Sequence, residues 1–197
     1  MEERQALGAL EDALERTRNL VEAVPSGAWH APTPCASFDV EQLNEHIVRD
    51  LTMFASTAAG DPSGSAPDAT AGDTKATDYG SAADALVQAW RRGGVEGRMV
   101  HGRRGDFPAT WALSQQTADV IVHGWDVAKA TGQKAEFDDA VVLDVLAWAS
   151  DNLRPEFRGD EASGKAFGQE VDVADDASPL DRLVAFFGRD PAWAPPS

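Results

Sequence analysis

The sequence contains a single cysteine, Cys35, among its 197 residues. One cysteine excludes an intramolecular disulfide and any zinc or iron–sulfur site built from several cysteines. Basic residues are also scarce, because 17 Lys and Arg stand against 33 Asp and Glu and give a formal net charge of -16. That charge would repel the phosphates of nucleic acid and the anionic face of a membrane. We therefore expect neither nucleic acid nor membrane as a partner.

Long hydrophobic runs are missing as well. The longest, AVVLDVLAWA at 140–149, is far shorter than the ~20 apolar residues of a membrane span and contains Asp144. The first 20 residues are charged and lack the apolar centre of a signal peptide. A chain of this length with 43% apolar residues can form a full core without disulfides. These features predict a soluble cytoplasmic protein.

Apolar residues recur at the spacing of one helix face along most of the chain. Six segments carry this pattern: 7–24, 40–54, 81–90, 110–131, 139–153 and 180–187. The fourth segment is apolar on nearly every side around 120–128, which indicates burial inside a bundle. We expect an all-α fold with an up-and-down four-helix core and extra C-terminal helices. The whole chain, 1–197, is predicted to be one domain, with its bundle core at about 2–155 and a C-terminal appendage at 156–197.

Local signals predict where several of these helices begin and end. Asp39 followed by Gln42 resembles a capping box. Ser81 and Asp84 predict the start of the third helix, and Ser178 before a proline predicts the start of the last one. Gly132 is well placed to end the fourth helix.

Three stretches between or after these helices look different. Residues 58–80 contain no Leu, Ile, Val, Phe or Met, so we expect a long loop there, either a lid or a solvated excursion. Residues 93–108 hold five glycines and end at Pro108, which is typical of a hairpin or an irregular connector. Residues 167–173 alternate apolar and polar positions like a short strand.

One face of the fourth predicted helix is small or polar: Ala112, Gln116, Asp119, His123, Asp126 and Ala130. Asp119 and His123 are four residues apart, hence about 40° apart around the helix. In the second helix His46 flanks the apolar stripe, about 60° from Leu43 at ~100° per residue. Ionisable groups inside a bundle are costly unless they are paired, hydrogen-bonded or coordinated.

Two arrangements would satisfy these groups. In one, Asp119 and His123 pair with each other through an internal ion pair or hydrogen bond. In the other, both bind a divalent metal together with His46. Two imidazoles and one carboxylate suit zinc, nickel or ferrous iron. Three protein ligands would leave coordination positions open, as catalytic sites need. Spacing alone leaves both arrangements open.

Three blocks of sequence carry a resemblance to a known family. They are PTPCASFDVEQLNEHIVRD at 32–50, ADVIVHGWDVAKATGQ at 118–133 and AFGQEVDVADDASPLDRLVAFFGRDP at 166–191. Together they resemble the actinobacterial metal-binding family related to the N-terminal domain of mycothiol-dependent maleylpyruvate isomerase. That family belongs to the DinB-like superfamily of helical bundles.

The resemblance implies a divalent metal held by His46, Asp119 and His123, with zinc as the first expectation and nickel or iron as alternatives. It also implies mycothiol, or another low-molecular-weight thiol, as a cosubstrate that ligates the open position and ionises there. Two features depart from the characterised isomerase. Asp119 stands where that enzyme has a glutamate, and that enzyme carries an additional C-terminal domain.

The expected function is therefore a thiol-dependent transferase or isomerase acting on a small electrophile. Asp126 and Gln116 are candidates for supporting the ligands or contacting the substrate. The alternative for Asp126 is a bond to backbone groups at a helix contact. Two alternatives keep the metal: a hydrolase that activates water, and a non-catalytic metal-binding bundle. The resemblance also makes a homodimer an expectation.

Overall fold

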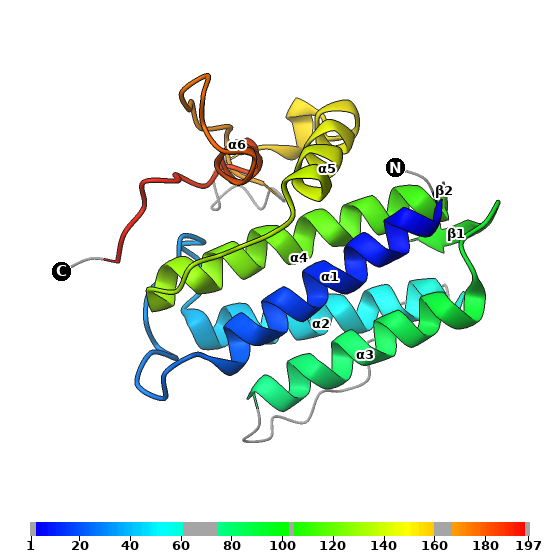
Figure 1. Ribbon diagram of the computed structural model, residues 1–197, viewed down its shortest axis with the longest axis horizontal. Coiled ribbons are helices and arrows are strands. Elements are labelled where there is room, and N and C mark those ends of the chain that lie inside the picture. Colours follow the sequence, from blue (N-terminus) through cyan, green and yellow to red (C-terminus); the bar gives the residue numbers. More distant parts are fainter. Residues whose placement is uncertain (1–2, 61–74, 103–104, 160–166, 196–197) are drawn as a thin grey trace.

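The structure, a computed structural model, describes residues 3–60, 75–102, 105–159 and 167–195. Its core consists of four long helices: α1 (Glu3–Glu22), α2 (Val40–Ala59), α3 (Lys75–Gly93) and α4 (Ala109–Thr131). Helix α1 packs on α4 and α2 packs on α3, while α2 also contacts α4 and α1 also contacts α3 (Figure 1). The predicted all-α fold with a four-helix core is confirmed.

Two further helices cover the side of α4 that faces away from α3 (Figure 1). They are α5 (Asp139–Asn152) and α6 (Pro179–Phe186), with a short 3-10 helix at Pro155–Phe157 between them. Both α5 and α6 contact α4 and each other. Helix α4 therefore lies inside the molecule and is buried around nearly its whole circumference. Its apolar sequence on almost every side predicted this position.

The predicted helix boundaries at three caps are confirmed. The Asp39 side chain accepts a hydrogen bond from the Gln42 amide at 2.9 Å, and the Gln42 side chain accepts one from the Asp39 amide at 3.1 Å. Gly132 ends α4 with a φ of 70°, which glycine adopts without strain. The Ser178 hydroxyl accepts from the amide of Asp181 at 3.1 Å and caps α6.

The start of α3 differs from the prediction. Residues 75–80 are helical although the whole of 58–80 was expected to be a loop, and α2 extends through Ala59. Tyr79 is fully buried and its hydroxyl donates to the carbonyl of Leu14 at 3.2 Å. The loop prediction considered only Leu, Ile, Val, Phe and Met, and so it did not include Tyr79 as a core residue. Ser81 and Asp84 consequently lie inside the helix and do not cap it, and residues 61–74 are outside the described part of the chain.

The glycine-rich connector before α4 is a β-hairpin. Strands β1 (Met99–Gly102) and β2 (Gly105–Pro108) pair antiparallel, with Val100 opposite Phe107. By contrast, the strand predicted at 167–173 is wrong: the described residues there form only an isolated bridge between Arg158 and Phe167. The Val171 amide instead donates to the carbonyl of Ala185 in α6 at 3.0 Å, and no strand among the described residues pairs with this segment.

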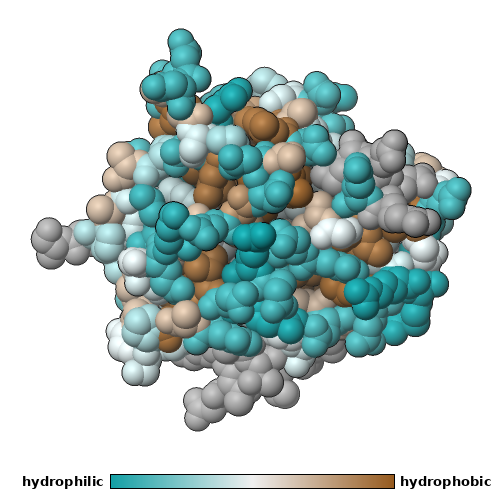
Figure 2. Space-filling model, viewed as in Figure 1, coloured by the Kyte–Doolittle hydropathy of each residue, from teal (hydrophilic) through white to brown (hydrophobic). Residues whose placement is uncertain are grey.

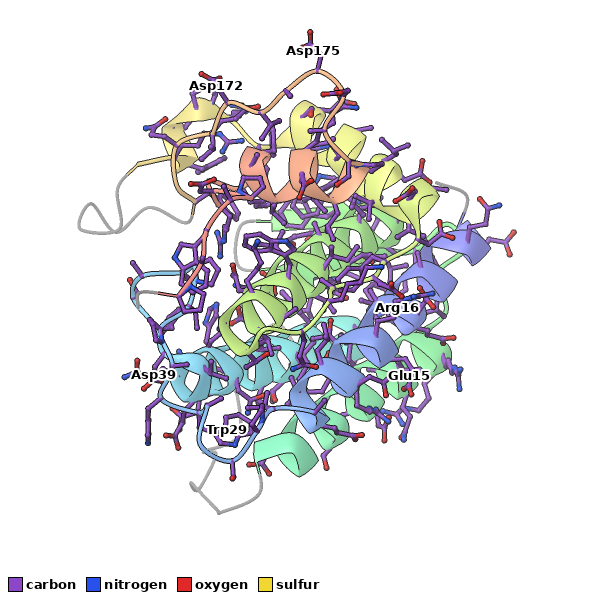
Figure 3. The ribbon with its side chains drawn as sticks, turned by 60° about the vertical axis from the view of Figure 1, so that its left-hand side comes forward. Glu15, Arg16, Trp29, Asp39, Asp172 and Asp175 are labelled. Atoms are coloured by element: carbon purple, nitrogen blue, oxygen red, sulfur yellow. The ribbon has the colours of Figure 1, made fainter. Side chains whose placement is uncertain are left out.

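The surface reflects the acidic composition. Figure 2 shows polar side chains over most of the face that includes α1 and α3, interrupted by small apolar patches. In Figure 3, Asp172 and Asp175 project from the segment before α6, on the opposite side of the molecule from Trp29 and Asp39 in the connection to α2. Within the described ranges, no helix is long and apolar enough to cross a membrane.

Candidate metal centre

Four ionisable side chains meet where α2 faces α4: His46, Asp50, Asp119 and His123, here called the α2–α4 cluster. His46 Nε2 lies 3.3 Å from an Asp50 carboxylate oxygen, one turn along α2. His123 Nδ1 lies 3.4 Å from an Asp119 carboxylate oxygen, one turn along α4. The two imidazole rings contact each other nearly at right angles, with centroids 5.0 Å apart. The structure thus brings together the three residues predicted as metal ligands and adds Asp50; their role as ligands stays a prediction.

Local packing holds His46 in this position. The apolar stripe of α2, which includes Leu43 and Ile47, is fully buried and fixes the face of the helix that carries His46. Phe38, in the connection before the capping box, stacks on the His46 ring at a centroid distance of 5.1 Å. The His46 ring therefore contacts both Phe38 and His123. Its side chain is 23% exposed, while that of His123 is 9% exposed.

The cluster changes the protonation of its members. Burial and the neighbouring His123 lower the pKa of His46 to about 4, so this imidazole is neutral at pH 7. Burial and the charge of Asp119 raise the pKa of Asp50 to about 7. Burial opposes the charged forms of Asp119 and His123, but their mutual attraction outweighs it, lowering the pKa of Asp119 and raising that of His123. A neutral imidazole is the form that ligates metals.

One buried atom of the cluster lacks a hydrogen bond. His123 Nδ1 has no hydrogen-bond partner, because its contact with Asp119 is close but poorly oriented for one. Leaving a buried polar atom unsatisfied costs about 1–3 kcal/mol, and such an atom is often explained by a ligand. As the side chains lie, no three His, Cys, Asp or Glu residues in the described segments are arranged to hold a metal ion. Imidazole and carboxylate groups are suitable ligands for a divalent cation. To bind one, these side chains would have to turn towards a common point.

Asp126, three residues after His123, has a partner from the other end of the chain. Its carboxylate is fully buried and forms an ion pair with Arg189 at 3.0 Å. Burial opposes the charge of Arg189, but Asp126 outweighs this and raises the arginine pKa above its ordinary value. The sequence predicted that Asp126 supports the ligands, contacts the substrate or bonds backbone groups at a helix contact. In the structure its partner is instead the guanidinium that follows α6.

Gln116, the other candidate for a supporting role, lies in the core. Its side-chain oxygen accepts a hydrogen bond from the indole nitrogen of Trp90 at 2.8 Å, and both residues are buried. This bond satisfies the polar end of Trp90 inside the bundle. The structure therefore gives Gln116 a packing partner one turn before Asp119.

Sequence reasoning missed two residues of this region, Asp50 and Arg189. Asp50 follows His46 by four residues, the same spacing that singled out Asp119 and His123, so the signal was available. Arg189 is 63 residues from Asp126. No periodicity links residues so far apart, because their contact depends on how α6 folds back onto α4.

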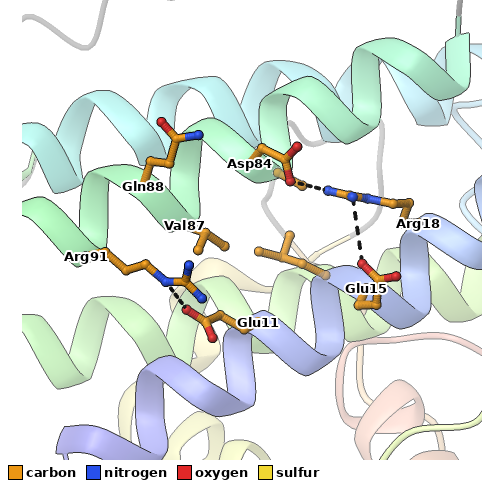
Figure 4. A pocket seen from close by; sticks show the side chains of 9 residues that line it. Glu11, Glu15, Arg18, Asp84, Val87, Gln88 and Arg91 are labelled. Atoms are coloured by element: carbon orange, nitrogen blue, oxygen red, sulfur yellow. Dashed lines mark hydrogen bonds and ion pairs between the residues drawn. The ribbon is translucent and has the colours of Figure 1, made fainter.

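A surface groove lies elsewhere, between α1 and α3 (Figure 4). Its charged walls pair across the two helices: Arg91 contacts Glu11 at 2.9 Å, and Arg18 contacts Asp84. None of the α2–α4 cluster residues lines this groove, here called the α1–α3 groove. Each carboxylate that lines the groove lies beside an arginine, whereas the cluster contains no arginine.

The fold and the cluster define a class of protein: a DinB-like helical bundle with histidines and carboxylates gathered between two of its helices. Residues 10–128 match the family described as the mycothiol maleylpyruvate isomerase N-terminal domain. This span includes all four cluster residues. The chain belongs to this family.

Similar full-length proteins occur in Mycobacterium tuberculosis. Two uncharacterized proteins, one from each of two strains, are 32% identical to the chain over 158 residues. The matched region covers 80% of this chain and 83% of each relative. No solved structure shows a significant match to the chain.

Proposed function

We propose that the protein binds a divalent cation through His46, Asp119 and His123, with zinc first and nickel or iron as alternatives. We further propose that it is a mycothiol-dependent transferase or isomerase acting on a small electrophile. One observation carries the metal proposal: two imidazoles from different helices contact each other beside a carboxylate, and a buried nitrogen of one of them has no hydrogen-bond partner.

The spacing of the donors supports this proposal. Two atoms that each lie about 2.1 Å from one cation are roughly 3.0 Å apart in octahedral and 3.4 Å apart in tetrahedral coordination. The Asp119 oxygen and the His123 nitrogen are 3.4 Å apart and do not form a hydrogen bond. Their distance suits neighbouring ligands of one cation. The neutral state of His46 supports the proposal further, since one ring nitrogen of a neutral imidazole carries no proton and can bind a metal.

The thiol part rests on the family and on the donor count. The family to which the chain belongs is named for a mycothiol-dependent isomerase domain. Three protein ligands leave a position for a small molecule. When bound, a divalent cation lowers the pKa of a thiol that ligates it. The protein's own residues would hold this site rigid: Phe38 fixes the His46 ring, and the burial of α4 fixes His123.

Elemental analysis of the full chain, purified without chelator or nickel resin, tests the metal proposal. We expect about one divalent ion per chain, and loss of that ion in His123→Ala and in Asp119→Asn. His101→Ala is the matched control, because His101 contacts Asp106 on the exposed hairpin and should keep the full metal content. Full metal content in both cluster variants, or a wild-type chain that binds no metal when it is supplied, would overturn the proposal.

A cobalt-substituted protein tests the thiol proposal separately. Addition of mycothiol should produce a sulfur-to-metal charge-transfer absorption, whereas the corresponding alcohol should not. The same addition to His123→Ala protein supplies the blank. An unchanged spectrum in a protein that holds stoichiometric cobalt would overturn the thiol role and leave the metal site standing.

A further inference from the structure

Asp50 is the one member of the α2–α4 cluster outside the predicted ligand set. We infer that Asp50 is a fourth protein ligand, so that the site offers two imidazoles and two carboxylates to one divalent cation. This inference rests on the metal binding proposed above and concerns which residues form the site. The three-residue ligand set proposed above does not include Asp50.

The first argument is geometric. Each of the two helices contributes one histidine and one aspartate four residues apart, in opposite order along the chain: His46 then Asp50 on α2, Asp119 then His123 on α4. The nitrogen–oxygen distances within the pairs are nearly equal, 3.3 Å and 3.4 Å. Both fall in the range of roughly 3.0–3.4 Å expected between neighbouring ligands of one cation. If Asp119 and His123 are ligands on this ground, His46 and Asp50 qualify on the same ground.

The second argument is burial. The side chain of Asp50 is 21% exposed, close to the 24% of Asp119. A surface carboxylate on α2 would be expected to turn into water, yet Asp50 lies against the His46 ring. Glu45, on the same helix, shows the alternative because it is exposed. Asp50 is therefore placed with the cluster and not with the solvated face of α2.

The third argument is charge. Two carboxylates in a half-buried cluster repel each other, and a divalent cation would neutralise both. The identity of the added donor also has a chemical consequence. Carboxylate oxygens favour harder cations such as Mn²⁺, whereas imidazoles favour Zn²⁺ and Ni²⁺. A ligating Asp50 should therefore matter more for Mn²⁺ than for Ni²⁺.

Metal titration of the full-length, metal-free chain tests this inference, using Mn²⁺ and Ni²⁺ as probes. For Asp50→Asn and Asp50→Ala we expect the Mn²⁺ affinity to fall about 100-fold and the Ni²⁺ affinity about 10-fold. Glu45→Gln removes one negative charge from the same helix and should change either affinity less than about twofold. Circular dichroism of each metal-free variant checks that the helices are retained.

A cobalt spectrum distinguishes direct ligation from a role in orienting His46. Loss of a ligand should change the d–d absorption of the Co²⁺-substituted protein in both Asp50 variants. An unchanged spectrum, with both affinities reduced by the same factor, would overturn direct ligation and make Asp50 a positioning residue. Affinities equal to those of Glu45→Gln would overturn any role in binding. In both cases the three-residue site would stand, whereas a wild-type chain that binds neither metal would overturn that site as well.

Discussion

The α2–α4 cluster gathers four ionisable side chains from two helices and the α1–α3 groove gathers five, but the charges are compensated differently in the two regions. In the groove every carboxylate faces an arginine, and most of these side chains are well exposed (Figure 4). In the cluster two carboxylates and two imidazoles are mostly buried, and the contacts between them leave one buried nitrogen without a hydrogen bond.

The difference is the reason for proposing a ligand site at the cluster and not at the groove. Exposed ion pairs are solvated and screened, so they contribute little to stability and need nothing further. Buried groups that repel one another or lack a partner reduce stability, and folds keep them where a ligand or a reaction uses them.

The ion pair between Asp126 and Arg189 is buried like the cluster, and its two charges balance each other like the ion pairs of the groove. Asp126→Asn leaves the guanidinium buried without its partner charge, and we expect the free energy of unfolding to fall by about 3–5 kcal/mol. Urea denaturation of the metal-free chain measures this. Asp175→Asn, which alters an exposed carboxylate ahead of α6 (Figure 3), should have almost no effect. Equal denaturation midpoints for the two variants would show that burial does not set the strength of ion pairs here.

The close approach of α1 to α4 can be tested at Gly124, the residue after His123. A Cβ at this position would lie 2.5 Å from the Thr17 hydroxyl and 3.1 Å from the Phe137 ring. Because Thr17 also bonds the Val120 carbonyl, it cannot move freely, and we expect Gly124→Ala to destabilise the protein by about 1–3 kcal/mol.

Thermal unfolding of Gly124→Ala should be compared with that of Gly8→Ala. A Cβ at Gly8 meets nothing within 4 Å in the described structure. That helix-interior substitution should therefore stabilise the protein by roughly 0.5–1 kcal/mol. Changes of the same sign in both variants would contradict the close contact between α1 and α4.

The Asp50 carboxyl should make the metal-free protein less stable as the pH rises through 7. The pKa of Asp50 is about 7 in the folded protein against 3.8 as its ordinary value, so the folded state binds the Asp50 proton more tightly than the unfolded state does. The stability linked to this proton is complete below about pH 4 and is lost as the pH rises through 7.

Asp50→Asn removes the ionisation altogether. At pH 8 we expect the metal-free variant to be about 1–3 kcal/mol more stable than the wild type, with the difference shrinking towards pH 4. Denaturation curves at several pH values measure it. A variant that is less stable than the wild type at pH 8 would mean that Asp50 is favourably placed without any ligand, in contrast to the cluster as described.

Sequence alone predicts the parts of this molecule that depend on local spacing. The capping box at Asp39 and Gln42 and the glycine end of α4 follow from a few neighbouring residues. His46, Asp119 and His123 could be placed together because the apolar stripes of two helices fix which faces meet. The caps depend on contacts within one or two turns, and the burial of each apolar stripe fixes which side chains of its own helix face the bundle.

The missed features depend on contacts between distant segments. The early start of α3 depends on Tyr79 burying its ring against α1, which a count of aliphatic residues cannot register. Arg189 reaches Asp126 only after α6 has folded over α4. Asp50 had the right spacing from His46, but its place in the cluster depends on how closely α2 approaches α4. In each case the deciding energy comes from tertiary packing.

The smallest predicted effect belongs to the α1–α3 groove. Asp84→Asn removes one of the two carboxylates that contact Arg18, and the Asp84 side chain is 61% exposed. Because water and salt already screen this pair, we expect the melting temperature to change by less than about 3 °C. In 1 M salt, where the Debye length is about 3 Å, the change should become smaller still. A loss of stability as large as that of Asp126→Asn, and insensitive to salt, would show that this exposed ion pair stabilises the protein as much as the buried one. The groove and the cluster would then differ in the pairing of their charges and not in the effect of burial.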